Sequence, residues 1–224
     1  MKIIISTLIF VFTLLSVCYS QSGWITQNGN TANELRDVQF VNAQTGWAVG
    51  FYGTIRKTTN GGLNWITQNT PATQEGFVCC YFSNDQTGWI GGGNQTLNYS
   101  YIYKTTNGGA NWTNQYNSSS SGLIMKMWFS GLLNGWAAGA GGKIMATTDG
   151  GQTWVQQNTG ITTDLTTIFF VNTNSGWAAG GAGVMLRTTN GGSVWSPFYR
   201  ELLRIWKACI SFLRLQAGLL DITV

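Results

Sequence analysis

The sequence predicts an all-β fold, a β-propeller of four-stranded antiparallel blades, on three observations. An eight-residue turn motif ending in tryptophan occurs four times, at steps of 47 (65 to 112), 42 (112 to 154) and 41 (154 to 195) residues. A Gly-Trp pair also recurs in each repeat, its tryptophan seven residues after a phenylalanine. Each repeat of about 42 residues holds four strand-like segments, which is the content of one propeller blade.

The turn motif reads Thr-Thr-Asn-Gly-Gly-x-x-Trp, with Asp in place of Asn in the third copy. Asn or Asp before two glycines is typical of tight hairpins, because glycine accepts positive φ and the polar side chain bonds the nearby backbone. The tryptophan adds apolar surface and one N–H donor beside the turn. We interpret the motif as a structural turn, whose residues are Asn60, Gly61, Gly62, Trp65, Asn107, Gly108, Gly109, Trp112, Asp149, Gly150, Gly151, Trp154, Asn190, Gly191, Gly192 and Trp195.

The four strands of a blade follow in order. The first is expected to end in an aromatic residue, at 38–40, 80–82, 127–129 and 168–170. A short second strand of small residues contains the Gly-Trp pair, and the fourth begins at the tryptophan of the turn. Complete blades are expected over residues 35–69, 77–116, 123–158 and 165–199, the second being longest because of extra residues at 91–99. The third strand carries an apolar residue at matching places, namely Ile55, Ile102, Ile144 and Met185.

Residues 1–20 are predicted to be a secretory signal peptide, because Lys2 precedes an apolar stretch that ends in small residues before Gln21. The apolar stretch is shorter than the roughly 20 residues of a membrane-spanning helix, so we expect no membrane span after removal of the signal. A lipoprotein attached through Cys18 and an uncleaved anchor are the alternatives. The chain is therefore expected to be exported to the extracellular space, the cell surface or the periplasm.

The repeats are incomplete at both ends. Residues 24–28 repeat residues 65–69 and are expected to form the last strand of a further blade. Residues 200–224 keep part of the spacing, with Phe212 and Leu219 in place of Phe170 and Trp177, and are predicted to be a degenerate or truncated fifth blade. A helix over 199–215 is the alternative, and an altered reading frame or a gene fragment would explain the change. The blades would either close as a five-bladed ring or form an open arc of a larger propeller.

Charge and histidine content limit the chemistry of the chain. Its 224 residues include 12 basic and 8 acidic ones, dispersed along the sequence, so we expect no nucleic-acid partner. The sequence has no histidine, which excludes Ser–His and Cys–His nucleophiles and almost all zinc chemistry. Cys79 and Cys80 point to opposite faces of one strand, with Cys80 expected in the core and Cys79 at the surface or between blades. We expect no catalytic residue, no metal and no cofactor.

The turn motif resembles the Asp-box of bacterial-neuraminidase-type (BNR) repeats. Together with the run Gly46-Trp47-Ala48-Val49-Gly50, it makes residues 24–195 similar to the photosystem II stability/assembly factor family. The resemblance implies a seven-bladed propeller that binds photosystem II intermediates through an arginine-rich patch. Similar repeats also occur in exported proteins of non-photosynthetic bacteria. The arginines within the four blades are Arg36, Arg56 and Arg187.

Two sets of residues are candidates for a partner surface. Lys57, Lys104 and Arg187 stand at equivalent third-strand positions and would ring a surface that attracts an acidic partner. The alternative is that these long side chains shield the strand near its turn, with their stems on apolar neighbours. Tyr99, Tyr101 and Tyr103, at the extra residues of the second blade and on the strand after them, are expected to be available to a partner.

These observations predict an exported, non-catalytic β-propeller that binds a protein or a glycan. Two alternatives remain. One is a photosystem II assembly factor, which requires a photosynthetic source. The other is a sialidase-like glycoside hydrolase, because sialidases carry Asp-boxes. The resemblance to sialidases implies an arginine triad, a Tyr–Glu pair and an acid, whereas the blades hold few carboxylates and suggest no facing pair.

Overall fold

The structure, a computed structural model, describes residues 26–71, 76–94, 99–119 and 122–198. The expected signal peptide at 1–20 and the expected fifth blade at 200–224 lie outside these residues. Of the strand expected at 24–28, residues 26–28 are described, and they are not in a strand.

The described residues form four antiparallel four-stranded sheets, which confirms the predicted fold class. Each sheet keeps the order of the chain, so its first strand and its fourth strand are its two edges. Blade 1 holds β1 (Leu35–Phe40), β2 (Gly46–Gly50), β3 (Ile55–Thr58) and β4 (Ile66–Thr67); blade 2 holds β5 (Gly76–Phe82), β6 (Gly88–Asn94), β7 (Tyr99–Thr105) and β8 (Thr113–Ser118). Blade 3 holds β9 (Ile124–Ser130), β10 (Asn134–Gly139), η1 (Ala140–Gly142), β11 (Ile144–Thr147) and β12 (Val155–Gln157); blade 4 holds β13 (Leu165–Phe170), β14 (Gly176–Gly180), η2 (Gly181–Gly183), β15 (Met185–Thr188) and β16 (Ser196–Pro197).

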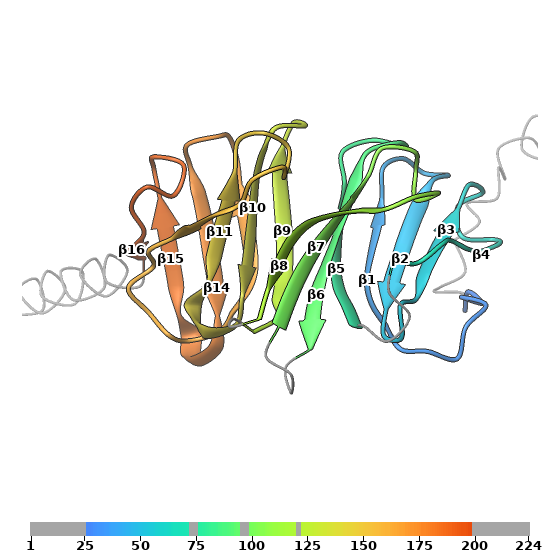
Figure 1. The fold of residues 1–224 in the computed structure, drawn as a ribbon, viewed down its shortest axis with the longest axis horizontal. Coiled ribbons are helices and arrows are strands. Elements are labelled where there is room, and N and C mark those ends of the chain that lie inside the picture. Colours follow the sequence, from blue (N-terminus) through green and yellow to red (C-terminus); the bar gives the residue numbers. More distant parts are fainter. Residues whose placement is uncertain (1–25, 72–75, 95–98, 120–121, 199–224) are drawn as a thin grey trace, which may run out of the picture.

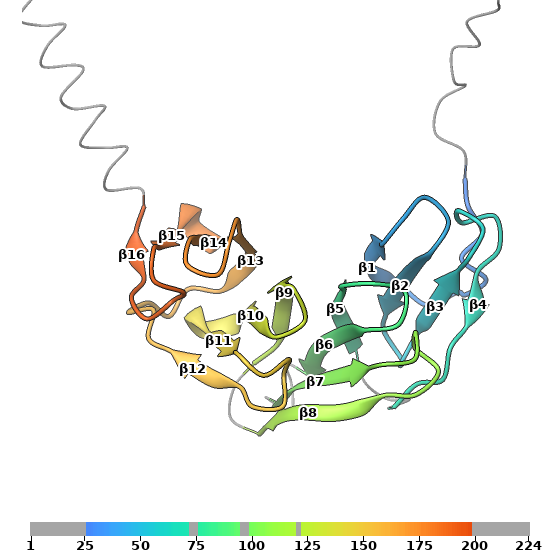
Figure 2. The same cartoon turned by 90° about the horizontal axis from the view of Figure 1, so that it is seen from above.

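The four blades follow one another along an open arc (Figures 1 and 2). Seen from above in Figure 2, the first strands β1, β5, β9 and β13 line the inside of the arc, and the fourth strands lie on its outside. Successive first strands contact one another, β1 with β5, β5 with β9 and β9 with β13. The inside of the arc is therefore a wall made of four edge strands, one from each blade.

The repeated Phe and Gly-Trp positions form one packing unit. In blade 1, Phe40 pairs with Gly46 across the first two strands, and the phenyl ring lies over the glycine. A Cβ atom on Gly46 would stand 2.7 Å from the Phe40 ring, so a larger residue there would displace it. The same pair recurs in each blade, as Phe82 with Gly88, Phe129 with Gly135 and Phe170 with Gly176.

The turn motif is held by a hydroxyl group. In blade 2, Thr105 Oγ1 accepts a hydrogen bond from Gly109 N at 2.9 Å and donates one to Asn107 Oδ1 at 2.9 Å. Asn107 Oδ1 in turn accepts one from Asn111 N at 2.8 Å. The two glycines have positive φ, 67° and 95°, a conformation that other residues rarely adopt. The same bonds hold the turns that begin at Thr58, Thr147 and Thr188.

Neighbouring blades are joined by the tryptophan of the second strand. Trp89 of blade 2 stacks on Phe129 of blade 3, with ring centroids 3.8 Å apart, and its Nε1 donates to Gly150 O at 3.1 Å in the turn of blade 3. Trp47 makes the same pair of contacts with Phe82 and Gly108 O, and Trp136 with Phe170 and Gly191 O. Each interface thus combines one stacked ring pair with one bond to a turn carbonyl, and we call this pair of contacts the blade latch.

The blade latch predicts the cost of substituting Trp89. Trp89→Ala should reduce the free energy of unfolding by about 3–5 kcal/mol, because a fully buried indole is lost. Trp89→Phe should cost less, about 1–2 kcal/mol, since a ring remains and Lys104 Nζ still donates to Gly150 O. Urea unfolding followed by far-ultraviolet circular dichroism measures both values. Equal costs would show that the stacked ring contributes little.

Candidate functional site

The third-strand lysines contribute to the blade latch. Lys57 Nζ donates to Gly108 O at 3.1 Å and lies 4.9 Å from the Trp47 ring centroid. Lys104 Nζ donates to Gly150 O at 2.9 Å and lies over Trp89. Burial lowers the pKa of Lys104, and the charge of Asp149 opposes that effect. Both lysines therefore bind the turn of the following blade.

Blade 3 replaces this lysine by Ala146, and another residue takes over its bond. Gln157 Nε2 donates to Gly191 O at 3.1 Å, alongside Trp136 Nε1 at 3.0 Å. Gln157 Oε1 also accepts a hydrogen bond from Trp195 Nε1 at 2.9 Å. Glutamine recurs at this fourth-strand position, three residues after the turn tryptophan, as Gln68, Gln115 and Gln157, and this repeat would have indicated the residue from the sequence.

Arg187, at the same position in blade 4, faces the end of the arc. Its guanidinium carbon lies 5.8 Å from the Trp177 ring centroid, as the lysines lie over their tryptophans. The described residues contain no blade after blade 4 whose turn could receive it. Arg187 Nε is buried and has no hydrogen-bond partner among the described residues.

The second-blade tyrosines differ from the expected surface. Tyr101 is 0% exposed, and its hydroxyl donates to Gly76 O at 2.7 Å. Its ring packs edge-on against Phe77, at a centroid distance of 5.8 Å. Tyr101 is therefore part of the core, and its prediction as an available residue is wrong. Tyr99 is half-buried beside it, with ring centroids 5.9 Å apart.

A hollow of about 480 Å³ opens on the inner wall of the arc. In every blade, the pairing of the first strand with the second is interrupted near the start of the first strand by a β-bulge. The bulges lie at 35–37, 77–79, 124–126 and 165–167. The residue inside each bulge lines the hollow, since a bulge turns a side chain away from its regular direction. These four residues are Arg36, Val78, Met125 and Thr166, and the remaining lining consists of Leu35, Asp37, Leu123 and Lys126.

An ion pair crosses this wall from blade 1 to blade 3. Lys126 Nζ lies 2.9 Å from Asp37 Oδ2, and the same oxygen accepts a hydrogen bond from Cys80 N in blade 2. Burial lowers the pKa of Lys126, but the hydrogen bond and the charge of Asp37 outweigh that effect and the pKa is raised overall. Gln39 adds a second link, because it bonds both Phe82 N and Phe82 O. Neither link was predicted from the sequence.

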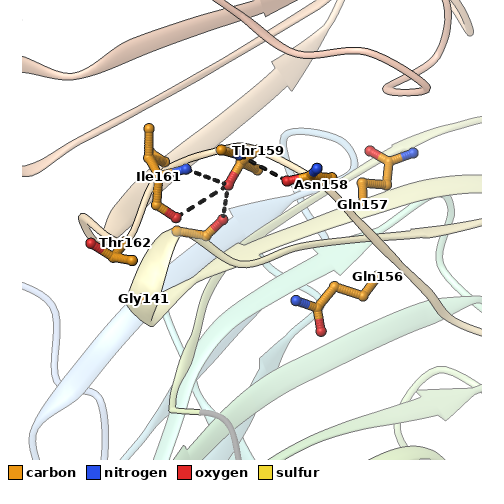
Figure 3. A pocket seen from close by; sticks show the side chains of 9 residues that line it. Gly141, Gln156, Gln157, Asn158, Thr159, Ile161 and Thr162 are labelled. Carbon is orange, nitrogen blue, oxygen red and sulfur yellow. Dashed lines mark hydrogen bonds between the residues drawn. The ribbon is translucent and has the colours of Figure 1, made fainter.

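A second hollow, of about 570 Å³, lies at the loop after β12 (Figure 3). Thr159 Oγ1 donates to Gly142 O at 2.7 Å, and Asn158 Oδ1 accepts from Gly160 N at 3.0 Å. These polar groups are therefore used by the loop itself. The lining contains no charged side chain and no aromatic ring; it consists of Gly141, Gly142, Gln156, Gln157, Asn158, Thr159, Gly160, Ile161 and Thr162.

Several described carboxylates have structural partners. Asp149 accepts hydrogen bonds from the side chain and the backbone of Thr153, which lower its pKa to about 2. Asp164 accepts from Gly141 N at 2.8 Å, and Glu34 pairs with Arg36. Burial raises the pKa of Cys79 and Cys80, as does the nearby charge of Asp37, so both thiols are held in the uncharged form. These thiols lie between blades, Cys79 against blade 3 and Cys80 against blade 1.

Two further facts concern metals and membranes. Within the described ranges, no three His, Cys, Asp or Glu side chains gather as they would around a metal ion. In the same part of the chain, no helix has the length and apolar content to cross a membrane.

The sheets, the Asp-box turns and the blade latch define a BNR-repeat β-propeller. The family model of the photosynthesis system II assembly factor YCF48 matches residues 17–115 and 117–201. The chain therefore belongs to this family. No curated protein sequence matches the chain.

Solved structures share the fold at low sequence identity. "YCF48 bound to D1 peptide" is 17% identical with a TM-score of 0.51, over 77% of this chain and 84% of that one. YCF48 from Cyanidioschyzon merolae is 21% identical with a TM-score of 0.59, over 79% of this chain and 59% of that one. An ancestral GH74 enzyme is 14% identical with a TM-score of 0.60, over 75% of this chain and 26% of that one.

The buried Lys143 predicts a pH dependence of stability. This residue is 4% exposed between blades 2 and 3, where Nζ donates to Ser100 Oγ at 3.2 Å, and burial lowers its pKa to about 8. The unfolded chain holds this proton up to the ordinary pKa near 10.4, so the penalty of burying the charge is full below pH 8 and fades above it.

Lys143→Met should therefore gain stability relative to the natural chain at pH 7, and this difference should shrink by about 2 kcal/mol by pH 10. Urea unfolding of both proteins across this range measures it. The comparison cancels the contributions of Tyr81 and the buried thiols, which both proteins share. A difference that stays constant with pH would contradict the assignment.

Proposed function

We propose that the chain is an exported, non-catalytic scaffold that binds a protein partner in an extended conformation on the inner wall of its arc. Export rests on the leader-like sequence of residues 1–20. The binding site is the hollow that spans the first strands of all four blades.

The convergence of the four bulged residues is the observation that carries this proposal. Scaffold positions, such as the turn glycines and the Gly-Trp pairs, hold the same residue in every blade. The bulged positions instead hold four different residues, Arg36, Val78, Met125 and Thr166, which line one hollow. The repeated residues form the scaffold, whereas the residues at these four positions differ from one blade to the next.

The chemistry of the wall suits an extended peptide. β1, β5, β9 and β13 are edge strands, and edge strands present backbone donors and acceptors to an added segment. Asp37 and Gln39 already bind Cys80 N, Phe82 N and Phe82 O on β5, so the other edge groups are the ones open to such a segment. Leu123, Met125 and Val78 are half-buried apolar side chains that offer pockets for alternate side chains of such a segment. Arg36, which pairs with Glu34, places a guanidinium at the blade 1 end of the hollow.

The comparisons support a protein partner. The chain belongs to the YCF48 family, and one solved YCF48 is bound to a D1 peptide. A role in photosystem II assembly is the specific form of this proposal and applies if the source is photosynthetic. The GH74 neighbours favour a glycoside hydrolase as the alternative, but the partners of Asp37, Asp149, Asp164 and Glu34 favour binding over hydrolysis.

Peptide binding tests the proposed function. Peptides selected from a displayed random library, together with the D1 peptide of the solved complex, are labelled and titrated with the chain by fluorescence anisotropy. Met125→Asp should raise the Kd at least about 10-fold, because it places an unpaired carboxylate among apolar contacts, a loss of about 1.4 kcal/mol.

Val155→Asp is the matched control, since Val155 is exposed on the outer strand β12 of the same blade. It should leave the Kd unchanged. If no peptide binds the natural chain, or if both variants weaken binding equally, the inner wall is not the binding site.

A further inference from the structure

The end face of the arc at blade 1 exposes side chains whose equivalents in blades 2 to 4 are buried. Val38 of blade 1 is 56% exposed, whereas its equivalents Cys80, Met127 and Ile168 are at most 2% exposed. Phe40 is 42% exposed, and its equivalents Phe82, Phe129 and Phe170 are each 2% exposed. In blades 2 to 4 these side chains are covered by the preceding blade. Blade 1 therefore presents the receiving half of an interface between blades.

The end face of the arc at blade 4 exposes the other half of an interface between blades, the half that packs on the following blade. Met185 of blade 4 is 36% exposed, whereas Ile55, Ile102 and Ile144 at the same position are at most 1% exposed. Trp177 is half-buried, in the place of the latch residues Trp47, Trp89 and Trp136. Phe169 is exposed as well, although its equivalents Tyr81 and Trp128 contact the following blade.

The two faces also carry matching polar groups. Blade 4 offers the donors of the blade latch, Trp177 Nε1 and the Arg187 guanidinium. Blade 1 offers the corresponding acceptor, the carbonyl of Gly61, which is equivalent to the carbonyls of Gly108, Gly150 and Gly191. A hollow of about 370 Å³ on the blade 1 face leaves room for entering side chains; it is lined by Gln27, Gly29, Leu35, Arg36, Asp37, Val38, Ala48 and Trp65.

We propose that blade 4 of one copy docks on blade 1 of a second copy and repeats the interface that joins blades within the chain. Trp177 would stack on Phe40 of the second copy, and Trp177 with Arg187 would donate to the Gly61 carbonyl. A head-to-tail contact closes into a ring if its rotation allows. The described residues of two copies contain eight blades, which lies within the range of about 4–8 blades found in propellers.

Self-complementarity is the reason to choose a second copy over another occupant. An unrelated partner would have to match an apolar face and a tryptophan donor by chance, whereas this chain carries both halves of an interface that it already forms three times. A small net charge of +4 per chain opposes association only weakly at ordinary ionic strength. Apolar faces of this kind also mark association sites in soluble proteins.

Light scattering coupled to size-exclusion chromatography tests the proposal on the full chain. The natural chain should have twice the mass of one copy. Val38→Asp alters the receiving face and Met185→Asp the entering face, so each variant alone alters both interfaces of the ring and should have the mass of one copy. An equimolar mixture should recover the mass of two copies, because a natural blade 4 face then meets a natural blade 1 face.

Two controls separate this contact from others. Val155→Asp, on the outer strand of blade 3, should keep the mass of two copies. Circular dichroism should show unchanged folding of all variants, since each altered residue is already exposed. A natural chain with the mass of one copy overturns the proposal. A Met185→Asp variant that keeps the mass of two copies also overturns it, because blade 1 would then pair with blade 1.

Discussion

The blade latch is the interaction on which the rest of the structure depends. A four-stranded sheet of this size has two apolar faces and cannot bury either of them alone. The stacked Trp and Phe rings bury these faces, and the bond from Trp Nε1 to the turn carbonyl fixes the register of one blade on the next. The Asp-box turn therefore does two jobs, since it closes the hairpin of its own blade and supplies the acceptor for the preceding one.

The inner wall follows from this stacking. Because the latch places every blade in the same orientation, the equivalent bulges of the first strands come to the same side of the arc. A feature that occurs once per repeat in the sequence thus becomes a continuous surface in the fold. Function can then vary at the bulged positions without changing the residues that hold the blades together.

The sequence predicted the strands and turns of each repeat, but not the bulge of each first strand or the contacts that occur once. Spacing alone was enough for the fold class, because Phe40, Gly46 and Trp47 have counterparts in every blade. Asp37 and Lys126 have no repeated signature; they are 89 residues apart and meet only because the arc brings β1 near β9. Tyr101 was expected to be exposed because it follows an extra loop, but it pairs with Gly92 across the strands and its hydroxyl reaches Gly76 O.

The ion pair between Asp37 and Lys126 also has a mechanical consequence. Among the described residues, the extensive contacts between strands of different blades join neighbouring blades, so the arc would otherwise behave as a row of units coupled only to the next unit. This pair spans blade 2 and acts as a tie between blades 1 and 3. The ion pair resists movement of blade 1 away from blade 3, which would flatten that part of the arc. We expect blades 1 to 3 to open together as one cooperative block, whereas blade 4, which lacks such a tie among the described residues, is the unit that can open by itself.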